Sequence, residues 1–447
     1  MNMDQSSSGT NPTPKAAAPV ADARRVRIVD LLRGVALLGI LLINIPFFSM
    51  PEYFSESFRS NPASGNFWLS TLIGIFVEGK MRALFGMVFG VGVLLFAMKK
   101  EETGRPVHGL FYRRMGWLVA FGLIHAHLIL WAGDILYLYG ICGMLVYLCR
   151  KWKPAVLVMF VPLVAMLDFT ANTLFYRNAR TVRIAYVDAV RAQNERLPLT
   201  EVQTKALTEW RELEKTLIPN REDVKENTRK MKSDYASVAS HVRPLAWVFE
   251  AKYLLFTLPD SLALMLLGIA LFQWGFLTGN WSRAAYWKTA LFGYVLGLPL
   301  VIFSTYYGVV HTPNLEAMLR YMETVPVPWV NLCYPFQRIF LVMAHIAVLI
   351  LIYRSGALQG LIRSLERVGQ MAFTNYIMQS VICTLFFFGY GLNQFAELQY
   401  YQIYVVAAAI CILQLVVSPL WLRHFYFGPL EWLWRSLTYW HLPPMKR

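Results

Sequence analysis

The sequence carries little charge for its length. Of its 447 residues, 15% are Asp, Glu, Lys or Arg, whereas soluble globular domains carry about 25%. Hydrophobic side chains make up 56% of the chain, and the mean hydropathy is +0.42. This balance excludes an ordinary soluble protein. Together with apolar runs of about 20 residues, it predicts a chain that crosses a membrane many times.

The sequence also has few cysteines, and none of them form a CxxC pair. Four of the five lie inside apolar runs and Cys333 lies at the start of one, so neither a disulfide framework nor a zinc site is indicated. The sequence contains no GxSxG motif, no HExxH motif and no glycine-rich phosphate loop. The glycines from Gly86 to Gly92 lie inside an apolar run, where small residues allow close helix packing.

The excess of positive charge indicates a membrane protein rather than nucleic-acid binding. The chain has 42 Lys and Arg against 27 Asp and Glu, a formal net charge of +15. These basic residues lie at the ends of apolar runs, as they do in the cytoplasmic loops of inner-membrane proteins. We therefore expect a multi-pass protein of the bacterial inner (cytoplasmic) membrane. Its expected partner is the lipid bilayer and not nucleic acid.

The N-terminus is predicted to be cytoplasmic. Residues 1–26 are rich in Ser, Thr, Pro and Ala and predict a disordered tail. The first apolar run, Val35 to Phe48, is not followed by a small-residue cleavage site, so it is expected to be a transmembrane helix rather than a signal peptide. Four arginines precede this apolar run, and basic residues at the end of a span keep that end in the cytoplasm. They are Arg24, Arg25, Arg27 and Arg33.

The pattern of apolar runs predicts an all-α fold. The expected architecture is a polytopic membrane helix bundle of about ten transmembrane helices, with the N-terminus and C-terminus both cytoplasmic. Residues 67–77 are apolar but short, and are expected to be re-entrant or interfacial. The spans are expected at about residues 31–50, 82–98, 114–131, 135–149, 155–175, 254–277, 286–308, 330–353, 371–391 and 401–422.

Changes in composition divide the chain further. The central polar segment carries mixed charge and predicts two surface helices, Val182 to Glu195 and Glu201 to Leu217. The last segment is aromatic and amphipathic, which is typical of a helix lying along a membrane surface. After the tail of residues 1–26, the expected units are a transmembrane bundle (27–176), an extracytoplasmic insertion (177–244), a second bundle (245–426) and an amphipathic cytoplasmic tail (427–447).

Ionisable side chains inside the apolar runs are the candidate functional residues. A charged group at bilayer depth costs a few kcal/mol or more, so it is retained for pairing, water access or chemistry. One interpretation is that these groups line a single outward-facing cavity; the other is that several are headgroup-level residues that snorkel or pair. On the predicted topology the outer half holds Glu78, Lys80, Arg82, His125, His127, Asp134, Asp260 and Arg338.

The two histidines of the central hairpin are not expected to bind a metal ion together. His125 and His127 are two residues apart, which is about 200° around a helix, so they cannot share one face. Each is therefore read separately, as a structural hydrogen-bonding group or as a functional one. His125 is the stronger candidate for chemistry.

A second polar set lies at the inner side. Asp30 and Arg33 are spaced i,i+3 at the start of the first span and can pair with each other. Asn375, Tyr376 and Gln379 give the inner half of the ninth span an uncharged polar face, with Asn375 and Gln379 spaced i,i+4. This face serves either helix–helix hydrogen bonding or a cytoplasm-facing pocket for a polar cofactor.

Five stretches together resemble the YeiB family of bacterial multi-pass membrane proteins. They are RIVDLLRGVALLGILLINI at 27–45, MRALFGMVFGVG at 81–92, RRMGWLVAFGLIHAHLILWAGDIL at 113–136, GQMAFTNYIMQS at 369–380 and FGPLEWLWRSLTYW at 427–440. The resemblance covers most of the chain from Arg27 onward and leaves out the insertion.

The LRG start of the first span also looks like the larger group of transmembrane acyltransferases, which includes the heparan-glucosaminide acetyltransferases. That resemblance implies transfer of an acyl group from cytoplasmic acyl-CoA to a hydroxyl or amine across the membrane. In those proteins the catalytic histidine lies near the outer end of the first helix. Here residues 41–66 contain no histidine, so His125 is the residue expected to take that role if the chemistry is present.

Acyl transfer is therefore the first functional hypothesis. His125 would remove the proton of the acceptor, and Asp134 or Asp260 would orient the His125 ring. Arg82 or Arg338 would stabilise the oxyanion or bind an anionic acceptor. Acyl-CoA is the expected donor, its CoA end is expected at the inner polar set, and no tightly bound cofactor is expected. The acceptor would be a lipid or a saccharide.

One further residue is a substrate-binding candidate, and two other functions are alternatives to acyl transfer. Glu78 is expected to join Asp260 and the two arginines at the substrate site. The alternative is a transporter or binding protein for a lipid or polar solute, although the two halves show no convincing internal repeat of the kind common in transporters. A structural or assembly factor is a third option. The oligomeric state is not given by the sequence.

Overall fold

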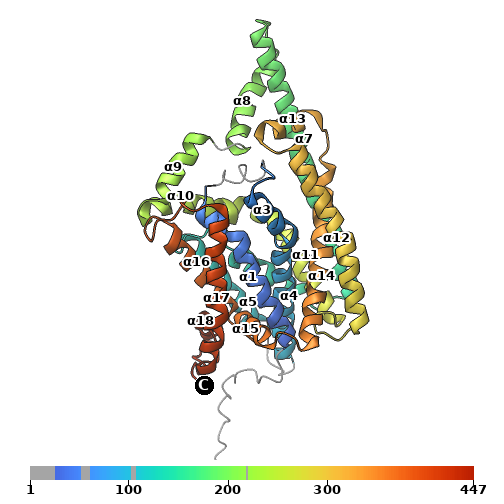
Figure 1. Cartoon of the computed structure of the whole chain (residues 1–447), viewed down its shortest axis with the longest axis vertical. Coiled ribbons are helices and arrows are strands. Elements are labelled where there is room, and N and C mark those ends of the chain that lie inside the picture. The colour runs from blue at the N-terminus through green and yellow to red at the C-terminus, as the bar shows by residue number, and fades with distance from the viewer. Residues whose placement is uncertain (1–25, 52–60, 102–106, 218–219) are drawn as a thin grey trace, which may run out of the picture.

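The computed structural model describes residues 26–51, 61–101, 107–217 and 220–447. These residues form a helical bundle, elongated in Figure 1, with no named strand among them. The prediction of a disordered tail at residues 1–26 lies almost entirely outside the described residues. The prediction of an all-α polytopic helix bundle is confirmed.

Each of the ten expected spans corresponds to a helix. Seven helical segments are long and apolar enough to cross a membrane, and two further apolar helices, α6 and α16, are shorter. The helices at the expected spans are α1 (Arg27–Ser49), α4 (Lys80–Glu101), α5 (His108–His127), α6 (Leu136–Cys149), α7 (Pro154–Asn194), α11 (Leu254–Gln273), α12 (Arg283–His311), α14 (Cys333–Ser355), α16 (Ala372–Phe387) and α17 (Tyr400–His424).

Shorter helices lie at the two ends of the bundle. The insertion helices lie at the upper end in Figure 1, and α15, α18 and the C-terminus lie at the lower end. The short elements are α3 (Gly65–Phe76), α8 (Glu201–Leu217), α9 (Arg221–Met231), α10 (Tyr235–Trp247), the π-helical turn η2 (Val248–Lys252), α13 (Leu315–Thr324), the 3-10 turn η3 (Trp329–Leu332), α15 (Gln359–Gln370) and α18 (Pro429–Tyr439).

Polar contacts tie the start of α1 and the C-terminal helices to the same end. Arg27 forms an ion pair of 3.1 Å with Glu366 of α15. Trp434 of α18 donates its indole N–H to the carbonyl of Arg114 in α5 at 2.8 Å. The first described helix therefore begins at the end of the bundle where the chain finishes, opposite the insertion (Figure 1).

The insertion is built on a long extension of α7. This helix has 41 residues and continues through residues 176 and 177, where the sequence analysis placed the border of the insertion. The expected surface helix Val182 to Glu195 is thus the distal part of α7. It is held by a 2.8 Å bond from the Tyr176 hydroxyl to the carbonyl of Val325 and by a 2.8 Å ion pair between Arg183 and Glu323.

The segment at residues 67–77 forms α3, a helix separate from α4. The chain turns between them at Gly79, whose φ of +74° favours glycine. Lys80 then donates its ammonium group to the carbonyl of Gly74 at 2.7 Å, which satisfies a free carbonyl at the end of α3. Lys80 is buried, so it caps a helix and does not snorkel to the membrane surface.

Close packing of α4 against α11 depends on two facing glycines. A Cβ atom built on Gly90 would overlap the carbonyl oxygen of Met265, and one built on Gly268 would overlap the carbonyl oxygen of Met87. The two backbones therefore touch where neither helix has a side chain. This confirms that the glycine-rich part of α4 serves helix packing.

We expect Gly90→Val to destabilise the folded protein by about 1–3 kcal/mol, because the new side chain forces the two backbones apart. Thermal unfolding of the detergent-solubilised protein measures the effect. Gly92→Val is the matched control, because the nearest heavy atom to a Cβ there is Arg33 Nη2 at 3.9 Å. Equal unfolding temperatures for the two variants would contradict this account of the α4–α11 contact.

Candidate functional site

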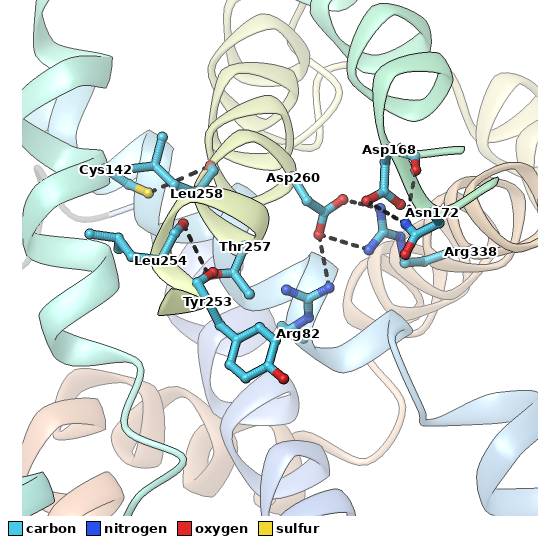
Figure 2. Close-up of polar contacts among 10 residues, drawn as sticks. All are labelled: Arg82, Cys142, Asp168, Asn172, Tyr253, Leu254, Thr257, Leu258, Asp260 and Arg338. Carbon is cyan, nitrogen blue, oxygen red and sulfur yellow. Dashed lines mark hydrogen bonds and ion pairs between the residues drawn. The ribbon is translucent and has the colours of Figure 1, made fainter. Parts of the chain in front are cut away.

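Three helices that are distant in the sequence meet at the carboxylate of Asp260 in α11. Arg82 of α4 donates from Nη2 to Asp260 Oδ2 at 2.8 Å, and Arg338 of α14 donates from Nη1 to the same oxygen at 3.0 Å. Arg338 Nη2 also pairs with Asp260 Oδ1. Figure 2 shows the carboxylate held between the two guanidinium groups. The structure thus brings three of the four predicted substrate-binding residues together.

This ionic cluster forms one wall of a cavity of about 250 Å³. The side chains of Arg82 and Asp260 are 36% and 22% exposed, whereas that of Arg338 is 6% exposed. The polar end of the cavity can therefore be reached from outside the protein. Its walls come from α4, α7, α11 and α14: Arg82, Val161, Val164, Ala165, Asp168, Phe256, Thr257, Asp260, Ala263, Leu264, Tyr334, Pro335, Arg338 and Ile339.

Glu78, the fourth predicted substrate-binding residue, is not brought to this cavity. It lies between α3 and α4, it is exposed, and it is not among the residues that line the cavity. Its place in the sequence, four residues before Arg82, did not carry it to the same surface, because the chain turns at Gly79 between them.

His125 and Asp134 form a buried pair. His125 Nδ1 lies 2.7 Å from Asp134 Oδ1, and the two side chains are 0% and 2% exposed. The second carboxylate oxygen of Asp134 accepts the backbone N–H of Tyr137 at 2.8 Å, at the start of α6. His125 Nε2 is buried and has no hydrogen-bond partner among the described residues. The imidazole is thus held at one nitrogen only.

The loop between α5 and α6 places the carboxylate beside the imidazole. The chain passes Leu130, whose φ of 64° is in the left-handed region, and Trp131 then stacks on Phe48 of α1 with ring centroids 3.9 Å apart. This reversal returns Asp134 to the end of the helix that carries His125. The prediction was that either Asp134 or Asp260 orients His125. In the structure, Asp134 is the residue that contacts the His125 ring.

His125 does not share a cavity with the two arginines. It is not among the residues that line the cavity at Asp260. The prediction that His125, Arg82 and Arg338 face one hollow is therefore not what the structure shows. The reason is that the Asp134 carboxylate fixes the ring at the α5–α6 turn, whereas Asp260 of α11 holds both guanidinium groups.

Tyr376 lies with the His125–Asp134 pair rather than with the rest of the inner polar set. Its ring meets the His125 imidazole edge to face, with centroids 5.0 Å apart. Its hydroxyl accepts the backbone N–H of Ile135 at 3.3 Å. Nothing in the spacing of α16 could have identified this contact, because Ile135 and Tyr376 are 241 residues apart.

The other inner residues are used for contacts within the protein. Arg33 donates to Asp30 at 2.9 Å, which confirms the predicted i,i+3 pair. Asn375 donates to Ser418 Oγ at 3.0 Å, and Gln379 donates to Gln414 Oε1 at 2.9 Å. The amides of α16 are buried and bond to α17, as the helix–helix interpretation predicted.

A second cavity, of about 280 Å³, lies at the opposite end of α4. It is basic, and the sequence analysis assigned none of its residues to a site. Arg150 and Lys151 follow the apolar run of α6 and belong to the basic residues that were predicted to mark cytoplasmic loops. The cavity is lined by Leu94, Ala97, Met98, Arg150, Lys151 and Gln273.

Glu431 is a further polar group at this end of the bundle, and the sequence does not show what it contacts. Its carboxylate, from α18, accepts the backbone N–H groups of Phe373 at 2.7 Å and Thr374 at 3.1 Å and the Thr374 hydroxyl at 2.5 Å. These donors open α16, so a side chain from the tail helix caps it. Desolvation raises the pKa of the Glu431 carboxyl above its ordinary value of 4.5.

We expect Glu431→Ala to cost about 1–3 kcal/mol of stability, because it leaves the N–H groups at the start of α16 without an acceptor. Glu431→Gln keeps one acceptor oxygen and should cost less. A raised folded-state pKa means that the stabilisation by the neutral carboxyl is complete below pH 4.5 and is lost as the pH rises through the raised pKa. The Gln variant should lose this pH dependence.

Thermal unfolding at about pH 4 and about pH 8 measures both effects. Glu316→Gln is the control, because its carboxylate is exposed on α13. If Glu431→Ala unfolds at the wild-type temperature at both pH values, the capping role is wrong.

Comparison with known proteins finds one family model and relatives that match over nearly the whole chain. Residues 271–441 match the family described as "Protein of unknown function (DUF418)". The chain is 27% identical over 438 residues to the "Uncharacterized protein YxaH" of Bacillus subtilis (strain 168), covering 96% of this chain and 98% of the relative. It is 26% identical over 420 residues to the "Uncharacterized protein YeiB" of Escherichia coli (strain K12), covering 92% of this chain and 95% of the relative. The chain is YeiB-like.

A third relative extends the comparison. The "Uncharacterized 39.9 kDa protein in amylase 3'region" of Bacillus acidopullulyticus is 25% identical over 428 residues, covering 94% of this chain and 96% of the relative. The expected YeiB resemblance is thus confirmed over nearly the whole chain, whereas these comparisons do not show the similarity to transmembrane acyltransferases. No solved structure matches the chain.

Proposed function

We propose that this YeiB-like protein is a membrane-embedded acyltransferase of the bacterial inner membrane. It would move an acyl group from cytoplasmic acyl-CoA to a hydroxyl of a lipid or saccharide acceptor at the outer face. The observation that carries the proposal is the buried His125–Asp134 pair, in which the Nε2 atom of the histidine has no hydrogen-bond partner among the described residues. A carboxylate-oriented imidazole with one free nitrogen has the arrangement that a general base requires.

The chemistry follows from the hydrogen bond between the pair. The ionised Asp134 carboxylate only accepts, so His125 donates from Nδ1 and keeps the lone pair on Nε2. The Nε2 atom of His125 takes the proton of the acceptor hydroxyl while the hydroxyl oxygen attacks the thioester carbonyl carbon of acyl-CoA. The C–O bond forms, the C–S bond breaks, and the imidazolium returns the proton to the CoA thiolate.

The surroundings of His125 suit this reaction. Its ring is shielded from solvent, which limits hydrolysis of the thioester by water. Tyr376 packs against the imidazole and belongs to α16, the helix whose first turn is capped from the tail by Glu431. The donor would approach from that inner side, where the basic cavity at Arg150 and Lys151 suits the phosphates of CoA.

A second candidate function is a binding protein or transporter for a lipid or polar solute. One observation favours it: the ionic cluster at Asp260 lines a cavity that does not include His125. A binding protein needs no base, so this candidate predicts that acyl-CoA is neither bound nor consumed.

The test is a transfer assay with the full-length protein reconstituted in liposomes of bacterial lipid extract. Radiolabelled acetyl-CoA and palmitoyl-CoA serve as donor probes, and label in the lipid and saccharide fractions is the readout. We expect label to move from at least one donor, and we expect native mass spectrometry to detect that acyl-CoA on the protein. Absence of both binding and transfer for both donors would refute the proposal and leave the binding-protein candidate.

A further inference from the structure

The cavity at Asp260 contains more positive than negative charge in its ionic cluster. Two guanidinium groups, of Arg82 and Arg338, share one carboxylate. A third cationic side chain, Lys80, lies two residues before Arg82 and is bound to a backbone carbonyl rather than to an acid. Within the described part of the chain, the cluster of two guanidinium groups and one carboxylate is thus one negative charge short of neutral, and Lys80 adds a further positive charge nearby.

A second acidic residue lines the cavity and adds a negative charge to it, but it does not pair with either guanidinium group. Asp168 of α7 lines the same cavity, but its carboxylate accepts from Asn172 on its own helix at 3.1 Å. It forms no ion pair with Arg82 or Arg338 among the described residues, and Figure 2 shows it bonded along α7. The two guanidinium groups therefore keep donors that Asp260 cannot satisfy.

Arg338 shows this shortage directly. Its side chain is 6% exposed, and its Nε atom is buried and has no hydrogen-bond partner in the described part of the chain. A guanidinium carries five N–H donors in a fixed fork, which matches the oxygens of a carboxylate or a phosphate. A buried donor of this kind at the wall of an accessible cavity calls for an anionic acceptor with several oxygens.

Apart from Asp168, Thr257 and Tyr334, the rest of the cavity wall is apolar. It includes Val161 and Val164 of α7, Phe256 of α11 and Ile339 of α14. On the outer surface of α7, apolar side chains such as Leu163 are exposed, as expected for a helix that faces lipid. A ligand that enters here would place its anionic group on the arginines and its hydrocarbon part along α7.

The size of the cavity agrees with an anionic headgroup. Its volume is about 250 Å³, whereas a water molecule occupies about 30 Å³ of the liquid. A phosphate group fits with room for its substituents, and hydrocarbon chains would have to leave through the mouth of the cavity.

We propose that the cavity between α4, α7, α11 and α14 binds the phosphate group of an anionic amphiphile, with Arg82 and Arg338 as its ligands. The shared chemistry is a phosphate held by two guanidinium groups in an apolar-walled cavity. Its source is either a membrane phospholipid or a soluble phosphorylated compound, and the experiment separates the two. The inference does not depend on acyl transfer at His125.

The experiment measures binding to the full-length protein in a neutral detergent by native mass spectrometry. Phosphatidylglycerol is the lipid probe, diacylglycerol is the same chains without phosphate, and inorganic phosphate is the soluble competitor. We expect phosphatidylglycerol to remain bound and diacylglycerol to dissociate. Competition by inorganic phosphate without retention of phosphatidylglycerol would assign the site to a soluble phosphorylated ligand. Binding of neither phosphate probe would refute the proposal.

Three variants locate the binding. Arg338→Gln should weaken binding of the retained probe at least tenfold, whereas Arg320→Gln, an exposed arginine of α13, should leave it unchanged. Asp260→Asn removes the carboxylate that competes for both arginines and should tighten binding several-fold. A merely structural cluster would not give tighter binding in that variant.

A folding failure of one variant does not close the question. If Arg338→Gln does not fold, Arg82→Gln takes its place, because it leaves the Arg338–Asp260 pair intact. Equal affinities of the wild type, Arg82→Gln and Arg320→Gln would overturn the proposal.

Discussion

His125→Gln should lower the rate of acyl transfer by about 10²–10⁴-fold, the range that a positioned general base contributes. The glutamine side chain is of similar size and polar but has no basic nitrogen, so the variant loses the base. The loss should appear in the transfer rate while binding of acyl-CoA persists. The reconstituted liposome assay measures the rate, and native mass spectrometry measures the binding.

The chain provides a matched control two residues away. His127 lies on the same helix and also contacts a carboxylate, with Nε2 at 2.8 Å from Glu250 of η2, but its side chain is 28% exposed. His127→Gln should keep most of the activity. A wild-type rate for His125→Gln, or equal losses for the two variants, would remove His125 from the proposed reaction.

Asp134→Asn tests the second member of the pair. An asparagine can present its amide to His125, which would favour the tautomer with the proton on Nε2 and abolish the base. The rate should therefore fall nearly as far as in His125→Gln. Because Asp134 also accepts the N–H of Tyr137, thermal unfolding must be measured in parallel to separate loss of activity from loss of α6.

The spans could be predicted because they depend on local composition. An apolar run such as Val35 to Phe48 has to be a helix in lipid, where the backbone polar groups need partners within the segment. Basic residues at the run ends then set the orientation. For the same reason the pairs within one turn or one hairpin were predictable: Asp30 with Arg33, and Asp134 near His125.

Contacts between distant segments were not predictable from spacing. Asp260 lies 178 residues from Arg82 and 78 from Arg338, and no periodicity shows which helices are neighbours. The sequence suggested a common site because each charge interrupts an apolar run. It could not show that His125 lies outside that cavity, because the position of a buried ring is fixed by tertiary contacts.

The extension of α7 shows another limit of composition. The share of charged residues rises after Tyr176, and the border between the first bundle and the insertion was therefore predicted there. The helix nevertheless continues to Asn194, because polar residues such as Arg183 remain compatible with a helix once the chain leaves the lipid. A change of composition is not a change of secondary structure, so the predicted border does not mark the end of the helix.

Asp260→Ala should destabilise the folded protein by about 3 kcal/mol, because it leaves two guanidinium groups without their shared counter-ion. We expect the lower end of the range for broken buried pairs, since the Arg82 side chain is 36% exposed and can be solvated. Thermal unfolding in a neutral detergent gives the measurement. Asp168→Ala is the control, because that carboxylate is exposed and bonds only along its own helix among the described residues.

A double variant separates the loss of the ion pair from the loss of the carboxylate itself. Arg338→Met combined with Asp260→Ala removes one buried charge of each sign and fills the space of the guanidinium with an apolar chain, so it should recover part of the lost stability. Phosphatidylglycerol should also stabilise Asp260→Ala more than the wild type, because its phosphate would take the place of the missing carboxylate. If Asp260→Ala unfolds at the wild-type temperature and phosphatidylglycerol does not raise that temperature, Asp260 does not hold the two arginines together.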